Sequence, residues 1–264
     1  MQRGPGMVLR RDQNNLDLKT AFITGASSGI GRATAVALAQ SGFQLVIAGR
    51  RREKLAEVAA EVAPTPVHIL TFDVREQAAV DAAVAGLPAE FRQIDVLLNN
   101  AGNAHGLAPI QDGDPADWDR MLDGNVKGLL YVSRAVLPLM GESGFIINIG
   151  SIAGHEAYAN GNVYCASKAA VAMLTRTMRL DLLPRGIRVA EVNPGAVETD
   201  FSAVRFKGDA ARASKVYEGF EPLRAEDVAE VIQFMVTRPA RVNIAEVLLL
   251  PAAQAAAATI RRES

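Results

Sequence analysis

The segment VYCASK (163–168) places three reactive side chains within five residues: Tyr164, the single cysteine Cys165, and Lys168. A cysteine nucleophile needs a general base, usually histidine, and the three histidines of the chain form no Cys–His signature. The stretch 161–186 has helical periodicity and stops at Pro followed by Gly. On such a helix Tyr164 and Lys168, at i and i+4, share one face, and Cys165 is turned about 100° away.

A phenol with its usual pKa of about 10 is a poor base at neutral pH, but a neighbouring ammonium favours its ionised form. Tyr164 and Lys168 are therefore interpreted as a tuned acid/base pair, with Cys165 as a small core residue. On this segment alone, an ordinary surface helix with Tyr and Lys spaced by chance remains open.

Length and composition favour one large domain over two small ones, since 264 residues with 49% hydrophobic content can bury a substantial core. We expect an N-terminal extension (1–17), a single main domain (18–252) with a long loop at 196–218, and a C-terminal tail (253–264). The tail is alanine-rich and of low complexity.

The charge balance excludes some partners. With a net charge of −1 and a pI near 6.3, the chain lacks the excess of positive charge typical of proteins that bind nucleic acid or anionic membranes. One cysteine cannot form an internal disulfide, which favours a cytoplasmic location. The opening 15 residues have no apolar core typical of a signal peptide, and no stretch approaches a membrane span. We expect no metal, nucleic-acid or membrane partner.

Short β-rich runs alternate with longer helical runs. Nearly continuous apolar strands joined by crossover helices form a parallel sheet that is covered on both faces. We therefore predict an α/β fold: a Rossmann-type doubly wound parallel sheet of about seven strands, with ligands beyond the C-terminal ends of the strands. The expected strands are 20–24, 44–48, 67–72, 95–100, 144–150, 187–193 and 245–250, and the expected helices are 29–41, 51–62, 75–85, 115–137, 162–183 and 225–237.

The first expected strand ends in the glycine-rich turn TGASSGIGRA (24–33), which leads into the first helix. Glycines let the backbone approach a pyrophosphate closely, and a helix N-terminus offers free N–H groups and a positive dipole end. The spacing G-x-x-x-G-x-G differs from G-x-G-x-x-G, but its position between strand and helix predicts a dinucleotide site.

The second expected strand ends at Arg50 and Arg51, where an NAD enzyme would carry a carboxylate for the ribose 2′-OH. Guanidinium groups can hydrogen-bond a 2′-phosphate, whereas a carboxylate would repel it. The arginines could instead be a solvated helix start, but cations oppose the dipole of a helix N-terminus. The predicted cofactor is therefore NADP(H).

Six ordered motifs resemble those of the short-chain dehydrogenase/reductase family: TGASSGIG (24–31), NNAG (99–102), Asn125, Ser151, YCASK (164–168) and NPGAVET (193–199). The resemblance covers residues 18–250 and implies an oxidoreductase with Tyr164 as acid/base. Residues 18–252 are then expected to be a single NADP-binding catalytic domain, with 196–218 as its substrate loop. The resemblance also implies that Lys168 lowers the pKa of Tyr164 and binds the nicotinamide ribose, that Ser151 orients the substrate oxygen, and that Asn125 supports a water relaying protons to Lys168.

Together with the arginines inferred above, the resemblance implies the following cofactor-binding residues: Gly25, Ser27, Ser28, Gly29, Ile30, Gly31, Arg50, Arg51, Asp73, Val74, Asn100, Ala101, Gly102, Tyr164, Lys168, Pro194, Gly195, Val197 and Thr199.

Segments outside these motifs, including VRFKGD (204–209) and RPARVNI (238–244), are similar to NADP-dependent 3-hydroxy acid dehydrogenases, also called L-allo-threonine or serine dehydrogenases. That group acts on small 3-hydroxy acids as a homotetramer. The alternatives are a 3-oxoacyl carrier-protein reductase, a broad-specificity carbonyl reductase, or a non-catalytic NADP-sensing protein. The last would be expected to have lost Tyr164 or Lys168.

A small hydroxy acid must be bound largely through its charge, because it offers little apolar area. Ser151 and Arg205 are the predicted substrate-binding residues, Arg205 because a guanidinium pairs bidentately with a carboxylate. The alternative is that Arg205 and Lys207 are solvated loop charges. The resemblance predicts a homotetramer. Exposed apolar positions expected on helices 115–137 and 162–183 also favour assembly, and the final strand and its tail could form a second interface.

Overall fold

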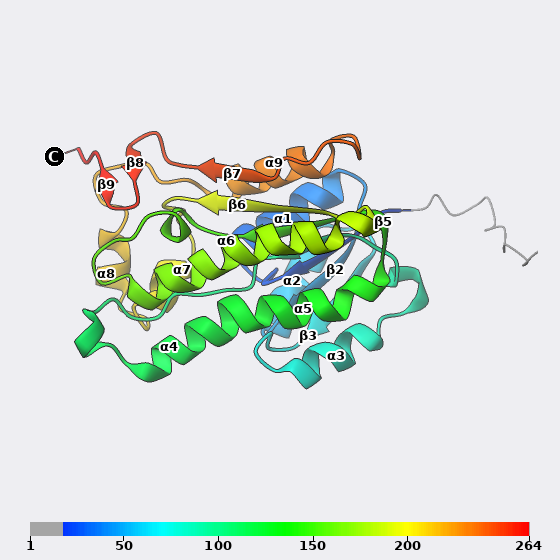
Figure 1. Ribbon diagram of the computed structural model, residues 1–264, viewed down its shortest axis with the longest axis horizontal. Helices are drawn as coiled ribbons and strands as arrows, with labels where there is room; N and C mark the ends of the chain where they lie inside the picture. The colour runs from blue at the N-terminus through cyan, green and yellow to red at the C-terminus, as the bar shows by residue number, and fades with distance from the viewer. Residues whose placement is uncertain (1–17, 264) are drawn as a thin grey trace, which may run out of the picture.

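The computed structural model describes residues 18–263 and contains one sheet of seven parallel strands in the order β3-β2-β1-β4-β5-β6-β7 (Figure 1). The predicted Rossmann-type fold is confirmed. The strands are β1 (Thr20–Thr24), β2 (Gln44–Gly49), β3 (Val67–Thr71), β4 (Ile94–Asn99), β5 (Met140–Ile149), β6 (Arg188–Pro194) and β7 (Glu246–Leu249). Within residues 18–263, no helix is both long and apolar enough to cross a membrane.

Different helices cover the two faces of the sheet. Helices α1, α2 and α9 pack on one face, and α3, α5 and α6 pack on the other (Figure 1). Because successive strand residues point to opposite faces, Ala21 and Ile23 of β1 enter the first layer and Phe22 enters the second. The helices are α1 (Gly29–Gln40), α2 (Arg52–Glu61), α3 (Gln77–Ala85), α4 (Pro115–Leu122), α5 (Gly128–Val136), α6 (Asn162–Leu182), α7 (Phe201–Arg205), α8 (Ala210–Lys215) and α9 (Ala225–Val236).

The expected single helix over 115–137 is wrong in one respect. A π-helical turn, Asp123–Lys127, separates α4 from α5 and contains Asn125. Such a turn inserts an extra residue without breaking the apolar face, so hydrophobic periodicity does not reveal it. The insertion after β6, expected to be rich in loops, contains the two short helices α7 and α8.

The alanine-rich C-terminal segment also differs from the expected tail, because it forms a two-stranded antiparallel hairpin, β8 (Gln254–Ala256) with β9 (Thr259–Ile260). The extension predicted for residues 1–17 lies outside the described residues.

A buried network of side-chain hydrogen bonds joins the middle of the sheet to α5 and α6. The Asn99 amide donates to Asn148 Oδ1 and to Ser133 Oγ, both at 2.9 Å. The Asn148 amide donates in turn to Thr175 Oγ1 at 2.9 Å, and the Thr175 hydroxyl donates to the carbonyl of Val171. Burial makes each of these groups dependent on its partner.

This network predicts that Thr175→Ala lowers the free energy of unfolding by about 1–3 kcal/mol, because it leaves the buried Asn148 amide without its acceptor. Thr177 on the exposed side of the same helix is the matched control, and Thr177→Ala should change stability by less than about 0.5 kcal/mol. Denaturant unfolding at one protein concentration measures both. Equal effects would contradict a specific role for the network.

Candidate active site

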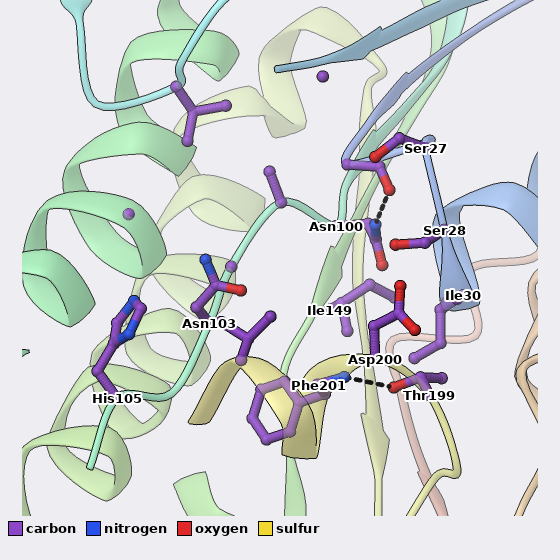
Figure 2. Close-up of a pocket in the computed structure, with 18 of the residues that line it drawn as sticks. Ser27, Ser28, Ile30, Asn100, Asn103, His105, Ile149, Thr199, Asp200 and Phe201 are labelled. Atoms are coloured by element: carbon purple, nitrogen blue, oxygen red, sulfur yellow. Dashed lines mark hydrogen bonds between the residues drawn. The ribbon is translucent and has the colours of Figure 1, made fainter. Parts of the chain in front are cut away.

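A cavity of about 770 Å³ opens at the C-terminal ends of the strands. Figure 2 shows residues reaching it from several parts of the chain: Ser27, Ser28 and Ile30 from the start of α1, Asn103 and His105 from the segment after β4, and Thr199 and Phe201 from the segment entering α7. Of the predicted cofactor residues, these line the cavity: Gly25, Ser27, Ser28, Gly29, Ile30, Arg50, Arg51, Asp73, Val74, Asn100, Ala101, Gly102, Tyr164, Lys168, Pro194, Gly195, Val197 and Thr199.

The glycine-rich turn fits a closely approaching dinucleotide. Gly25 has a φ of +65°, and a Cβ there would lie 2.7 Å from Asn100 Nδ2. Gly31, also predicted to bind the cofactor, is not among the residues that line the cavity. It allows close packing of the turn, since a Cβ there would lie 2.4 Å from the Gly25 carbonyl oxygen. Helix α1 has no acidic residue in its first turn, and Ser28 makes no side-chain capping bond. The first N–H groups of α1 therefore suit an anion such as a pyrophosphate.

Arg50, Arg51 and Arg75 line the cavity together with Asp73, and Arg50 and Arg75 lie beside the Asp73 carboxylate. Arg51 Nη2 donates to the hydroxyls of Ser27 and Ser28 at 3.1 and 3.0 Å. Arg50 Nη1 lies 3.8 Å from Asp73 Oδ2, and its side chain is 60% exposed. These positions fit a phosphate on the adenosine ribose, with Arg51 oriented by the glycine-rich turn.

Arg75 was missed by the sequence argument. Its Nε and Nη2 donate to the Asp73 carboxylate, at 3.0 Å to Oδ1 and 2.7 Å to Oδ2. This hydrogen bonding holds the pKa of Asp73 below its usual value. The Asp73 carboxylate therefore stays ionised and is held in place as a hydrogen-bond acceptor. The spacing of two residues between Asp73 and Arg75 in DVRE (73–76) was the signal available in the sequence.

Tyr164 and Lys168 rise from α6 beneath the other end of the cavity, and both are buried. The Lys168 ammonium donates to the carbonyl of Ile149 at 2.8 Å. Burial lowers the pKa of Lys168 to about 8. The amine therefore titrates near neutral pH, as suits a group that exchanges protons.

The pKa of Tyr164 is shifted in the direction opposite to the sequence expectation. Burial raises it well above the usual value, while a hydrogen bond with the Ser151 hydroxyl and the charge of Arg205 oppose the rise. A neighbouring ammonium favours the phenolate, but burial of the phenol, which only the fold shows, outweighs it. In the absence of further positive charge, Tyr164 is a neutral acid at pH 7.

Asn125 lies behind the cavity rather than on its wall. Its Oδ1 accepts from the backbone N–H of Asn103 at 2.7 Å, and its amide donates to the Asn103 carbonyl and to Ser167 Oγ. Asn125 therefore fixes the turn after NNAG against α6. Its predicted part in a proton relay to Lys168 stays a prediction.

A second, smaller cavity of about 130 Å³ adjoins Tyr164, and Arg205 lines it. Arg205 Nη2 donates to the Tyr158 hydroxyl at 2.9 Å, and its guanidinium carbon lies 5.6 Å from the centre of the Tyr164 ring. Lys207, the other candidate cation, instead forms an ion pair with the buried Asp117 at 2.9 Å. The two cations thus have different surroundings: Arg205, the residue preferred from the sequence, lies beside Tyr158 and Tyr164, and Lys207 lies beside Asp117.

Tyr158 and His105 complete the surroundings of Tyr164 and were not singled out from the sequence. His105 lines both cavities, and burial lowers its pKa. A histidine in a loop and a tyrosine without helical spacing to Tyr164 carry no local signal, so only the fold brings them together.

Comparison with known proteins identifies the family to which the chain belongs. The family model for short chain dehydrogenases matches residues 19–210. The chain is 45% identical to sulfoacetaldehyde reductase 2 of Chromohalobacter salexigens, covering 89% of this chain and 94% of that protein. It is 43% identical to the NADP-dependent 3-hydroxy acid dehydrogenase of Schizosaccharomyces pombe, covering 95% and 99%.

Among solved structures, the closed form of a serine dehydrogenase complexed with NADP+ superposes with a TM-score of 0.87 at 42% identity, covering 93% of this chain and all of that one. A serine dehydrogenase from Escherichia coli gives a TM-score of 0.77 at 38% identity, covering 89% and 99%. The chain belongs to the short-chain dehydrogenase family and is an oxidoreductase.

The geometry of α6 predicts that Tyr164→Phe reduces kcat by about 10²–10⁴-fold, because it removes the proton-transferring hydroxyl and little else. Binding of NADPH, followed by its fluorescence, should be largely unchanged. The neighbouring Cys165→Ala is the control and should be close to neutral. If Cys165→Ala abolished activity and Tyr164→Phe remained active, the chemistry would belong to the thiol.

The arginine cluster predicts that Arg50→Asp raises the KM for NADP+ by about tenfold to a hundredfold, the cost of one charged bidentate contact, and narrows or reverses the preference over NAD+. Arg52→Asp makes the same charge change at the first residue of α2 and should leave the preference intact. Steady-state kinetics with both cofactors test this. An unchanged NADP+/NAD+ ratio in Arg50→Asp would contradict the assignment.

Proposed function

We propose that this protein is an NADP-dependent oxidoreductase that interconverts small 3-hydroxy acids, of the serine, allo-threonine or 3-hydroxypropionate type, with their carbonyl forms. The observation that carries the proposal is the Arg205 guanidinium beside the Tyr164 ring in a cavity of about 130 Å³. A cation next to an acid/base group suits a substrate whose anionic group lies a few bonds from the reacting carbon.

The cavity residues account for the proton chemistry. In the oxidation direction the carbinol C–H bond breaks with its electron pair leaving as hydride, while the O–H proton passes to the phenolate of Tyr164 and a C=O bond forms. Ser151, which hydrogen-bonds Tyr164, can donate to the same substrate oxygen. Reduction reverses these steps, with neutral Tyr164 as the acid.

Oxidised NADP, when bound, supplies the hydride acceptor and a positive charge near Tyr164. That charge favours the phenolate, against the effect of burial on the pKa of Tyr164. Lys168, one helical turn further along α6, can hold or release the proton that Tyr164 exchanges, because its pKa is about 8.

The size of the small cavity favours small substrates over long acyl chains. Contacts from the segment around α7 close it: the backbone N–H of Gly106 donates to the Arg205 carbonyl at 3.0 Å, and Lys207 pairs with Asp117. This supports a 3-hydroxy acid over the 3-oxoacyl carrier-protein and broad carbonyl reductase alternatives.

A sulfonate-bearing aldehyde is a second candidate substrate, because one of the relatives reported above is named for sulfoacetaldehyde reduction. A guanidinium can pair with a sulfonate as it does with a carboxylate. Initial rates with NADP+ across serine, allo-threonine, 3-hydroxypropionate, 3-hydroxyisobutyrate and simple alcohols, and with NADPH and sulfoacetaldehyde, rank these substrates. Faster turnover of uncharged alcohols than of any acid would contradict the proposal.

We further propose a cytoplasmic homotetramer with a single catalytic domain over residues 18–252. Two groups of exposed apolar side chains support assembly: Met173, Leu180 and Leu183 on and just after α6, and Phe234 with Leu248 on α9 and β7. Light scattering should give a mass near four chains. A mass near that of one chain would contradict this part of the proposal.

The position of Arg205 predicts that Arg205→Ala raises the KM for 3-hydroxy acids at least about tenfold, the effect of losing about 1.4 kcal/mol of binding, and leaves uncharged alcohols unaffected. Lys207→Met provides a comparison. Because Lys207 holds the segment to Asp117, its loss should affect charged and neutral substrates alike. Equal losses for both substrate types in Arg205→Ala would show a role in loop folding. No loss would place the anion site elsewhere.

A further inference from the structure

Glu191 is a buried carboxylate close to the reactive end of the cavity. It lies on β6 with 2% of its surface exposed, although acidic residues are seldom fully buried without a partner. Its Oε1 has no hydrogen-bond partner among the described residues, and neither has Nδ2 of Asn193, two residues further along the strand. A buried acid without its full set of partners requires an explanation, and proton transfer is one that such groups serve.

The alternation of β6 points the Glu191 side chain toward α6, which runs alongside this strand (Figure 1). Val189, two residues earlier, packs in the core layer that α6 covers. Glu191 is in register with Asn148 of β5 and with Glu246 of β7. Because register partners share a face, and Asn148 donates to Thr175 of α6, these three polar side chains form a row beneath the helix.

The inner side of Glu191 lies next to Lys168. Lys168 Nζ donates to the carbonyl of Ile149, the last residue of β5, and a Cβ at the following Gly150 would lie 2.2 Å from Glu191 Oε1. The absence of a side chain at Gly150 thus lets the carboxylate reach the strand end that holds the ammonium. Burial lowers the pKa of Lys168 and raises that of Glu191, and in each case the charge of the other group opposes the shift.

The outer side of Glu191 leads to the surface through Glu246 and His155. Glu246 Oε1 lies 3.3 Å from His155 Nε2, and the two side chains are 39% and 27% exposed. Both groups act on Glu191: burial raises its pKa, the charge of Glu246 adds to this, and the charge of protonated His155 opposes it. Histidine is the side chain that most readily exchanges protons at neutral pH. Protonatable groups therefore extend from the ammonium to solvent.

Two arginines of α6 complete the charged groups on this face. Arg176 Nη2 lies 3.6 Å from Glu246 Oε2. Arg179 donates to the carbonyls of Val189 and Ala245 at 2.8 and 2.9 Å, and so holds β6 and β7 to the helix. An arginine side chain stays protonated in proteins, so these two hold the surrounding groups in place without exchanging protons.

We propose that Glu191 takes the proton of Lys168 and passes it to His155 and Glu246 at the surface. In the oxidation direction an N–H bond of the Lys168 ammonium breaks, an O–H bond forms on Glu191, and the proton then moves to the imidazole or the Glu246 carboxylate, directly or through a bridging water. Reduction reverses the order. Glu191 acts through Lys168, and this route is separate from the relay predicted for Asn125.

The use of this route in turnover rests on the proposed function, whereas the coupling of Glu191 to Lys168 does not. NMR titration of the resting full chain, labelled with ¹³C in its six lysines, tests the coupling. The signal missing from Lys168→Arg identifies Lys168. Glu191→Gln keeps the shape and removes the charge, and it should lower the Lys168 pKa by about one unit or more, as expected for the loss of a nearby opposite charge.

Two further variants separate charge from packing. Glu191→Asp keeps the carboxylate and should leave the Lys168 pKa close to its parent value. Glu142→Gln makes the same charge change at an exposed position of β5 and should leave it unchanged.

The surface end of the route is tested by turnover of the double variant His155→Gln/Glu246→Gln, whose side chains are partly exposed and so can be changed without disturbing the core. In dilute buffer its kcat for hydroxy acid oxidation should fall several-fold with little change in KM. Concentrated imidazole should restore kcat, because a soluble base then accepts the proton. A purely structural loss would be the same at every buffer concentration.

The proposal would be overturned by an unchanged Lys168 pKa in Glu191→Gln, or by an equal change in Glu142→Gln. It would also be overturned by a double variant whose kcat in dilute buffer is that of the parent or is not restored by imidazole. A shifted Lys168 pKa together with no turnover of hydroxy acids by the parent protein would instead contradict the proposed function alone.

Discussion

The site depends on the hydrogen bonds between Thr24 and Asn100, which join the ends of two neighbouring strands. Thr24 Oγ1 accepts from the backbone N–H groups of Asn100 and Ala101, each at 3.0 Å, and the Asn100 amide donates to the carbonyls of Thr24 and Gly25 at 2.9 and 3.2 Å. Strands β1 and β4 are adjacent in the sheet, although the chain visits β2 and β3 between them. Their ends are the point where connections diverge to opposite sides of the sheet and a crevice opens.

These contacts fix two turns at once. The glycine-rich turn after β1 and the turn at 100–102 are held against each other, and Asn125 holds the continuation of the second turn from behind. The cavity, the start of α1 and the approach to Tyr164 are built outward from this point. These bonds hold the edge of the sheet at β1 and β4, and each surrounding loop is held by contacts of its own. Residues far apart in sequence therefore share one cavity.

The reactive end of the cavity combines burial with charge. Lys168 and Glu191 are both buried, and burial lowers the pKa of Lys168 while it raises that of Glu191. Each opposes the shift of the other through its charge. Burying two charged groups is costly, but Lys168, with a pKa of about 8, is suited to exchanging a proton near neutral pH.

Much of the fold and part of the site could be predicted from sequence, because these depend on local patterns. Apolar runs located the strands, the glycine spacing located the turn before α1, and the i,i+4 spacing placed Tyr164 and Lys168 on one helix face. The π-helical turn around Asn125, the raised pKa of Tyr164 and the hairpin that holds Ala196 could not be predicted. Each depends on burial or on contacts between distant segments, as with Gln254 and Ala196, 58 residues apart.

Hydride transfer in this cavity is expected to run directly between NADPH and a small carbonyl compound that carries an acid group. The most direct measurement supplies NADPH carrying deuterium at both C4 positions together with malonic semialdehyde, and analyses the product by mass spectrometry. The expected product is 3-hydroxypropionate with one deuterium, on the carbon that bears the new hydroxyl group. A product without deuterium, or no product at all with the cofactor bound, would contradict this expectation.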